Sequence, residues 1–274
     1  MVEVTLTPRG PYSLRLTTGR ARWSCALPEG RHAEAIQLPG GEVLVRASSE
    51  QAVDEARFVL ALDDDTSEFH RRFADDPLVG RCTRLLRGLR PRRRPTVAHA
   101  ALRAVCGQLV QAGKALQLER AVIRACGEEA PSREGLLRLS PAALTRCGLA
   151  ASRAAALHRL CRTVDLEQLK QAPDTALARL RRVSGIGPWS VGVIALQGLG
   201  RYDAGLVGDL GLVKLQASLE GRWPEASETS GLLEPYGEWQ GLASVFLLRG
   251  FERGLVAGAS KDRARLVRAS ARAV

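Results

Sequence analysis

The stretch that decides the fold is Leu180–Leu215, which reads LRRVSGIGPWSVGVIALQGLGRYDAGLVGDLGLVKL. A helical pattern ends at Val183, and a tight turn with two glycines follows at residues 184–187. Pro188 favours a new helix, because its missing N–H would be unpaired at a first helical position. The start of that helix offers unpaired N–H groups and a partial positive charge, which suit a phosphate. The stretch therefore predicts a helix-hairpin-helix, with Ile186 anchoring the turn in the core.

An aspartate follows this hairpin at the start of the next helical run. The segment Gly208-Asp209 precedes a helical pattern over Leu212–Leu219, so Asp209 lies where a helix N-cap is expected. Taken alone, such a residue is most often a plain N-cap, whose carboxylate accepts a hydrogen bond from a backbone N–H.

With the hairpin and Asp209 together, the chain resembles the helix-hairpin-helix DNA glycosylases, a superfamily with an essential aspartate after its Gly/Pro-rich loop. The resemblance implies that Asp209 is catalytic. It also implies that residues of the hairpin contact DNA, namely Gly185, Ile186, Gly187 and Ser190. Trp189 stands where bifunctional members carry a Schiff-base lysine, which implies a monofunctional enzyme. Val207-Gly208 replaces the family's usual proline before the aspartate.

The resemblance extends to a second DNA-contacting segment. Residues 96–127 are strongly helical, and Gly107 interrupts their pattern. A matching Gly-Gln-Leu segment in the family places an apolar wedge at the DNA, which implies that Gln108 contacts DNA and that Leu109 is the wedge. An apolar side chain that fills the gap left by a flipped-out base offsets part of the unstacking energy. Without the resemblance, Leu109 would be interpreted as a core leucine.

The first third of the chain predicts a small sheet. Five alternating segments are expected as strands, followed by a helix over Glu50–Leu62: Val2–Thr7, Tyr12–Thr17, Arg22–Leu27, Ala33–Leu38 and Glu42–Ala47. The segment GLRPRRRP, residues 88–95, predicts an exposed boundary. This order resembles the 3-methyladenine DNA glycosylase II proteins. We expect an α+β fold, with a TBP-like antiparallel-sheet domain over residues 1–90 and a two-lobed, mostly α-helical module over residues 91–274.

Charge is distributed unevenly along the chain. The net charge is +11, yet residues 1–90 carry equal numbers of acidic and basic side chains, so all of the excess lies in residues 91–274. A basic helical part favours a polyanionic partner such as double-stranded DNA. The alternative is a solvated basic surface, because arginine far exceeds lysine throughout the chain.

The remaining composition predicts neither a cofactor nor a membrane segment. The six cysteines form no C-x-x-C pair and none follows Cys161, so they are interpreted as reduced thiols and not as an iron–sulfur loop. The four histidines are scattered, and no metal site is expected; the resemblance leaves open a monovalent cation at the hairpin carbonyls. No signal peptide or membrane-spanning run is recognised. We expect a cytoplasmic, nucleoid-associated bacterial monomer.

The expected chemistry is hydrolysis of an N-glycosidic bond. Asp209 would stabilise the oxocarbenium-like sugar and orient the attacking water. Trp189 would either stack on the flipped base in the base pocket or pack in the core. Related alkylbase glycosylases line this pocket with aromatic residues; here Val193, Leu210 and Val245 stand at the matching positions, leaving Tyr236, Trp239 and Phe246 as further candidates. The base is expected to be alkylated; deaminated or oxidised bases, or non-catalytic binding to damaged DNA, are the alternatives.

Overall fold

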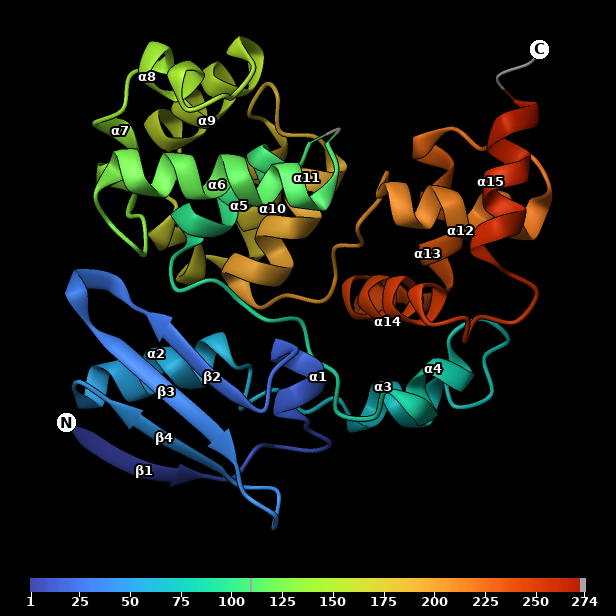
Figure 1. Cartoon of the computed structure of the whole chain (residues 1–274), viewed down its shortest axis with the longest axis horizontal. Helices are drawn as coiled ribbons and strands as arrows, with labels where there is room; N and C mark the ends of the chain where they lie inside the picture. The colour runs from blue at the N-terminus through green and yellow to red at the C-terminus, as the bar shows by residue number, and fades with distance from the viewer. Residues whose placement is uncertain (109, 272–274) are drawn as a thin grey trace.

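The computed structural model describes residues 1–108 and 110–271, and Figure 1 shows a small sheet beside two groups of helices. The sheet is antiparallel, with the order β1-β4-β3-β2. Its strands are β1 (Val2–Leu6), β2 (Arg22–Ala26), β3 (His32–Gln37) and β4 (Val43–Ala47). Helix α2 (Glu50–Val59) covers one face, where its Ala52 and Ala56 pack with Val43 and Val45 in one buried cluster. The alternating pattern thus predicted these four strands correctly.

The predicted strand at Tyr12–Thr17 is wrong, because this segment contains helix α1 (Leu14–Thr18). The Ser13 hydroxyl accepts a hydrogen bond from the Leu16 N–H at 3.3 Å, and Gly19 ends the helix with φ 78°. Leu14 and Thr17 are both buried, on one face of the single turn. The local capping signals therefore outweigh an alternation that a short helix also satisfies.

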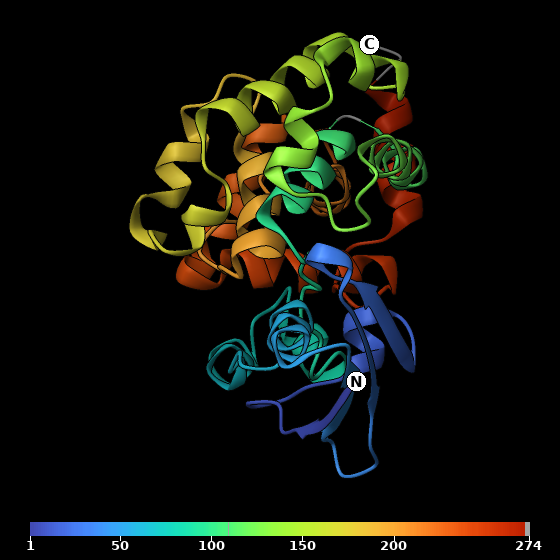
Figure 2. The ribbon, with the colours of Figure 1, turned by 90° about the vertical axis from the view of Figure 1, so that its left-hand side faces the viewer.

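Most of the rest of the described chain is helical, and the helices that follow residue 96 lie above the sheet in the view of Figure 2. The α-helices are α3 (Ser67–Arg72), α4 (Gly80–Leu85), α5 (Val97–Gly107), α6 (Ala112–Cys126), α7 (Arg133–Leu137), α8 (Pro141–Arg146), α9 (Ala151–Thr163), α10 (Pro173–Arg181), α11 (Pro188–Ile194), α12 (Leu210–Glu220), α13 (Thr229–Leu233), α14 (Gln240–Glu252) and α15 (Lys261–Ser270). Short helical turns are η1 (Pro28–Gly30), η2 (Glu167–Lys170), η4 (Ala226–Glu228) and η5 (Glu234–Trp239), and α11 continues into the π-helical turn η3 (Ala195–Leu199).

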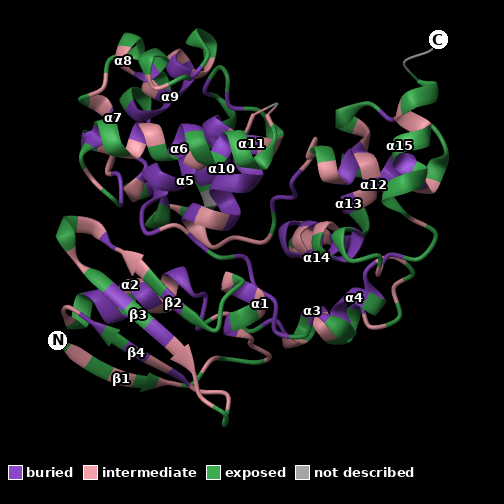
Figure 3. Ribbon diagram, in the orientation of Figure 1, coloured by how far each residue is buried: buried purple, intermediate pink, exposed green. Residues whose placement is uncertain are grey.

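Two buried clusters hold the molecule together. One lies between the sheet and α2, and the other runs through the helices from Phe69 on α3 to Ala264 on α15. Helix α5 is buried along almost its whole length, as the purple ribbon in Figure 3 shows. Because one cluster joins α3 to α15, the two groups of helices in Figure 1 share a core.

The segment 88–95 is not the exposed linker that its prolines and arginines predict. Arg90 is only 1% exposed and Arg93 only 6%. The Arg90 guanidinium lies 4.9 Å from the centre of the Tyr12 ring. It donates to three carbonyl oxygens, those of Arg9, Pro11 and Ala61. Arg93 forms an ion pair with Asp64 at 2.5 Å. A planar guanidinium can be buried when backbone carbonyls and a carboxylate accept hydrogen bonds from its donors. This segment is therefore a buried connection between the sheet and the helices.

Within residues 1–108 and 110–271, no helix combines the length and the apolar character needed to cross a bilayer.

Candidate active site

The predicted hairpin is present between α10 and α11. Ile186 is 5% exposed and its N–H donates to the Val183 carbonyl at 3.0 Å, so the predicted anchoring of the turn in the core is confirmed. Gly185 has φ +91°, and a Cβ there would come within 2.6 Å of the Ala156 Cβ on α9. Glycine is therefore required at this position both by the backbone conformation and by the close approach of α9.

Helix α11 begins with Pro188 directly after the turn. Its first intrahelical bond runs from the Val191 N–H to the Gly187 carbonyl at 3.0 Å. The N–H groups of Trp189 and Ser190 precede that bond and point along the start of the helix, as first-turn donors do. Ser190 is only 2% exposed and its hydroxyl accepts a hydrogen bond from Gln108, so this hydroxyl is not available to DNA.

Asp209 is the N-cap of α12, and both of its carboxylate oxygens accept hydrogen bonds. Oδ1 accepts from the Gly211 N–H at 2.7 Å, and Oδ2 accepts from the Trp189 indole N–H at 2.9 Å. Asp209 is half-buried. In Figure 1, α11 lies in one group of helices and α12 in the other, so the indole bond connects the two groups. Asp209 therefore serves as the N-cap expected of a lone aspartate and is also held in a fixed position beside the hairpin.

The Trp189 ring lies between Asp209 and the end of α5. A Cβ on Gly107 would come within 2.5 Å of the ring carbon Cη2, so the indole packs directly on this glycine. Trp189 is half-buried and packs against the helical core. The interruption of the helical pattern at Gly107 thus has a specific cause, since only glycine leaves room for the ring.

Gln108 connects the predicted wedge segment to the hairpin. Its side-chain Nε2 donates to the Gly185 carbonyl and to the Ser190 hydroxyl, each at 2.9 Å. In this structure the Gln108 amide is therefore engaged by the hairpin, next to the residues predicted to contact DNA. Leu109, the predicted wedge, lies outside the described residues.

The hairpin carbonyls fit a monovalent cation poorly. Besides the Gln108 amide on Gly185, the Arg159 guanidinium on α9 donates to the Ser184 carbonyl at 2.9 Å, and the Val183 carbonyl accepts from Ile186. A cation there would have to share each of these oxygens with the donor that it already binds. Across the described part of the chain, no three His, Cys, Asp or Glu side chains gather as they would around a metal ion.

Most of the aromatic candidates for the base pocket lie away from Asp209. Tyr236 is 1% exposed and Phe246 is fully buried, so these two candidates for the base pocket are core residues. Trp239 stacks on Tyr202 with ring centres 5.8 Å apart and packs against Phe69. Of the aromatic candidates, Trp189 alone is hydrogen-bonded to Asp209.

Two residues near the site escaped the sequence analysis. Gly107 was recognised only as an interruption of a helix, although it contacts the Trp189 ring. Arg159 belongs to an amphipathic helix, where an exposed arginine is ordinary, and nothing in its spacing indicates a bond to the hairpin. Leu210, which directly follows Asp209, is 47% exposed.

No protein-family model matches the chain. The curated DNA-3-methyladenine glycosylase of Bacillus subtilis (strain 168) is 26% identical over 207 residues, which cover 69% of this chain and 68% of that protein. The solved 3-methyladenine DNA glycosylase from Archaeoglobus fulgidus superposes with a TM-score of 0.76 at 18% identity, covering 91% of this chain and 98% of that one.

A second solved structure is an oxidised-base enzyme. The Clostridium acetobutylicum 8-oxoguanine glycosylase/lyase, in complex with double-stranded DNA containing cytosine opposite 8-oxoG, has a TM-score of 0.71 at 18% identity and covers 89% of this chain and 92% of that one. The hairpin, the aspartate bonded beside it and the likeness to these proteins together confirm the resemblance seen in the sequence: the chain has the fold of the helix-hairpin-helix DNA glycosylases.

Proposed function

We propose that this chain is a monofunctional DNA glycosylase of base excision repair. It flips a damaged base out of duplex DNA, hydrolyses the N-glycosidic bond and leaves an abasic site, acting as a monomer without a cofactor. The observation that carries the proposal is the Asp209 carboxylate, held through both oxygens beside the hairpin. The names of the Bacillus and Archaeoglobus proteins support an alkylated base as the substrate.

The geometry suits the demands of the reaction. The glycosidic bond is inaccessible until the nucleotide leaves the stack, so the enzyme must grip the backbone while the base is extruded. The first-turn N–H groups of α11, with Gly185, Ile186 and Gly187 ahead of them, would bind a phosphate. A wedge at Leu109 would fill the vacated stack.

Asp209 would then act on the sugar and on the attacking water. As the base departs, the sugar gains positive charge, which a fixed carboxylate stabilises. A carboxylate offers about four acceptor sites, and the bonds from Gly211 and Trp189 occupy two of them. The remaining capacity lets Asp209 orient the water and accept its proton. Because the two bonds are already formed, the carboxylate needs little reorganisation during the reaction.

The hairpin sequence supports the proposal that there is no lyase step. A Schiff base requires an amine, and Trp189 stands at the position where a lysine would provide one. The only lysines of the chain lie in other segments: Lys114, Lys170, Lys214 and Lys261. Water is therefore the nucleophile in our proposal.

A second candidate keeps the chemistry but changes the base. The Clostridium neighbour is named for 8-oxoguanine, an oxidised base. The burial of Tyr236 and Phe246 also leaves few aromatic faces beside Asp209 for a cationic alkylated base, which binds well to electron-rich rings. Oxidised or deaminated bases therefore belong in the same test.

The test is base release from duplexes that each carry one lesion, with wild type beside Asp209→Asn. The panel contains 3-methyladenine, 7-methylguanine, 1-methyladenine, hypoxanthine, uracil and 8-oxoguanine. Asparagine is a good N-cap, so α12 keeps its cap, and an unchanged melting temperature controls for folding. We expect wild type to release an alkylated base and the variant to lose that activity.

Two further readouts separate the alternatives. Product strands that break only after alkali treatment agree with a monofunctional enzyme, whereas direct nicking contradicts one. Release of only 8-oxoguanine, hypoxanthine or uracil would transfer the proposal to oxidised or deaminated bases. Silence across the panel with DNA binding intact would indicate a non-catalytic binder of damaged DNA.

A further inference from the structure

A hollow of about 500 Å³ lies beside the hairpin, between the C-terminal half of α9 and the end of α10. Three arginines line it: Arg159 from α9, and Arg179 and Arg182 from the end of α10. Ser184 of the hairpin lines it as well, so the hollow is continuous with the proposed phosphate-binding turn.

The charge in this hollow is not balanced by the protein. Asp165 is the one acidic residue in its lining, and one carboxylate oxygen of Asp165 accepts a hydrogen bond from the Gln168 N–H at 3.3 Å. Within the described residues, neither Arg179 nor Arg182 has a carboxylate oxygen within 4.0 Å. Like charges that converge without a counterion repel one another, so an anion is the ligand that this hollow would stabilise.

Some other arginines of this chain are paired with carboxylates. The Arg31 guanidinium lies between the carboxylates of Glu29 and Glu55, at 2.6 and 2.7 Å. Arg222 is likewise paired with Glu220 at 2.8 Å. Arg179 and Arg182 lack such a partner within the described residues, and the hollow that they line adjoins the proposed phosphate-binding turn.

We propose that this hollow binds backbone phosphates of the same DNA duplex that the hairpin grips, next to the hairpin-bound phosphate. The inference rests on the proposed function, because it assumes that α11 faces DNA. Ser184 and Gly187 are three residues apart, which is at most about 11 Å of extended chain. The lining of the hollow therefore begins, at Ser184, within about 11 Å of the start of α11, a separation that neighbouring phosphates of one strand can span. The fork-shaped donors of arginine suit phosphodiester oxygens.

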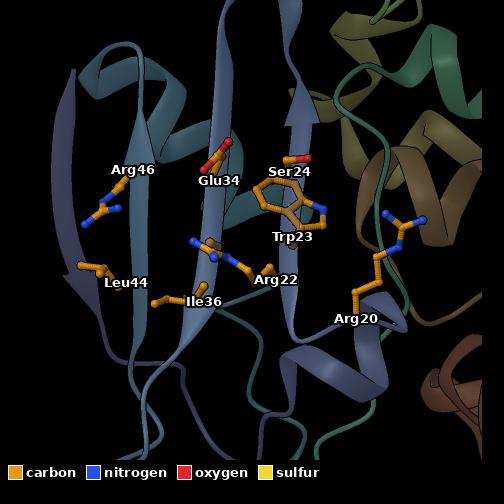
Figure 4. A pocket seen from close by; sticks show the side chains of 9 residues that line it. Arg20, Arg22, Trp23, Ser24, Glu34, Ile36, Leu44 and Arg46 are labelled. Carbon is orange, nitrogen blue, oxygen red and sulfur yellow. The ribbon is translucent and has the colours of Figure 1, made fainter.

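The chain provides a matched control in a second arginine-lined hollow. Figure 4 shows this hollow, of about 440 Å³, on the sheet, with Arg22, Glu34 and Arg46 on neighbouring strands and Arg20 at the edge. Arg20 and Arg22 are exposed, as Arg179 and Arg182 are. The double variants Arg179→Gln/Arg182→Gln and Arg20→Gln/Arg22→Gln therefore remove equal charge from two different hollows.

The test measures the affinity of each double variant for an undamaged fluorescent duplex between 50 and 200 mM NaCl, where each lost phosphate contact lowers the salt slope by about 0.9. Two lost contacts should lower the slope by about 1.8, which corresponds to a fall in affinity of up to about 60-fold at 0.1 M salt. The control variant at the sheet should keep the wild-type slope. Inorganic phosphate at 10 mM contributes roughly a tenth of the ionic strength in the assay. It should not remove the difference in slope between wild type and Arg179→Gln/Arg182→Gln, because the ligand is the polymer backbone.

The outcomes of this test and of the test of proposed function can be told apart. A wild-type slope in Arg179→Gln/Arg182→Gln overturns the inference, even if wild type releases bases from the lesion panel. Equal losses in both double variants also overturn it, because they would show a general charge effect. A reduced slope in the hollow variant alone supports the inference, even if no base is released. Unchanged melting temperatures confirm that these exposed substitutions leave the fold intact.

Discussion

Replacing Trp189 by phenylalanine tests whether the indole N–H positions the Asp209 carboxylate. Phenylalanine keeps an aromatic ring but removes the donor that lies 2.9 Å from Oδ2, together with the indole atoms nearest Gly107, and the control below carries the same change in side-chain size. A hydrogen bond to a charged group contributes about 1.5–3 kcal/mol. If that energy is lost in the transition state, the single-turnover rate of base release should fall by about 10- to 150-fold. Affinity for the lesion duplex should change little, because the bond lies within the protein.

The assay is single-turnover base release with enzyme in excess over the lesion duplex that wild type processes fastest. Trp239→Phe is the matched control, since the buried Trp239 indole nitrogen has no hydrogen-bond partner within the described residues. Its removal breaks no bond, so the control should keep the wild-type rate. A wild-type rate in Trp189→Phe would refute the reasoning. A loss confined to duplex affinity would refute it too, because the ring would then act in binding rather than in positioning Asp209.

Three further predictions concern packing, titration and thiols. Gly107→Ala places a Cβ 2.5 Å from the indole ring, so base release should fall at least tenfold. The free energy of unfolding, measured by urea melts, should fall by about 1–3 kcal/mol. Gly113→Ala is the control: its Cβ meets nothing within 4 Å, so the free energy of unfolding should rise by about 0.5–1 kcal/mol. Burial lowers the pKa of His99, so the stability that its neutral form contributes is complete above the ordinary pKa of about 6.5 and decreases below it. The urea midpoint of wild type should therefore fall between about pH 7.5 and 5.5, and His99→Gln should flatten that fall. An equally steep fall in the variant would contradict this. Cys25 and Cys147 are half-buried, and the other four thiols are buried. Two thiols should therefore react rapidly with a disulfide reagent in the native protein, and all six should react in denaturant. Rapid reaction of all six without denaturant would contradict the burial.

The local features of the candidate site could be predicted from the sequence. Pro188 at a first helical position and Gly185 in a turn define the hairpin through backbone preferences that operate within a few residues. The N-cap position of Asp209 follows from the same kind of signal. The four strands also follow from alternation, since a half-buried sheet imposes that period on any sequence.

The bonds that make the site chemically specific depend on tertiary structure. The hydrogen bond from Trp189 to Asp209 joins helices α11 and α12, and the contact between Trp189 and Gly107 joins α11 to α5. No local preference encodes either contact. They depend on how the helices pack, which the hydrophobic pattern of each helix does not determine by itself.

Burial of charge was likewise decided by tertiary contacts. The arginine-rich segment 88–95 has the composition of an exposed linker, yet Arg90 is buried because carbonyl groups distant in sequence accept its hydrogen bonds. The aromatic residues Tyr236 and Phe246 were candidates for the base pocket, yet they pack into the core beside α3. The sequence by itself determined where helices, strands and turns begin and which aspartate follows the hairpin, because those signals are local. Only the tertiary structure decided which side chains meet that aspartate, because such contacts arise from packing between segments that are far apart in the chain.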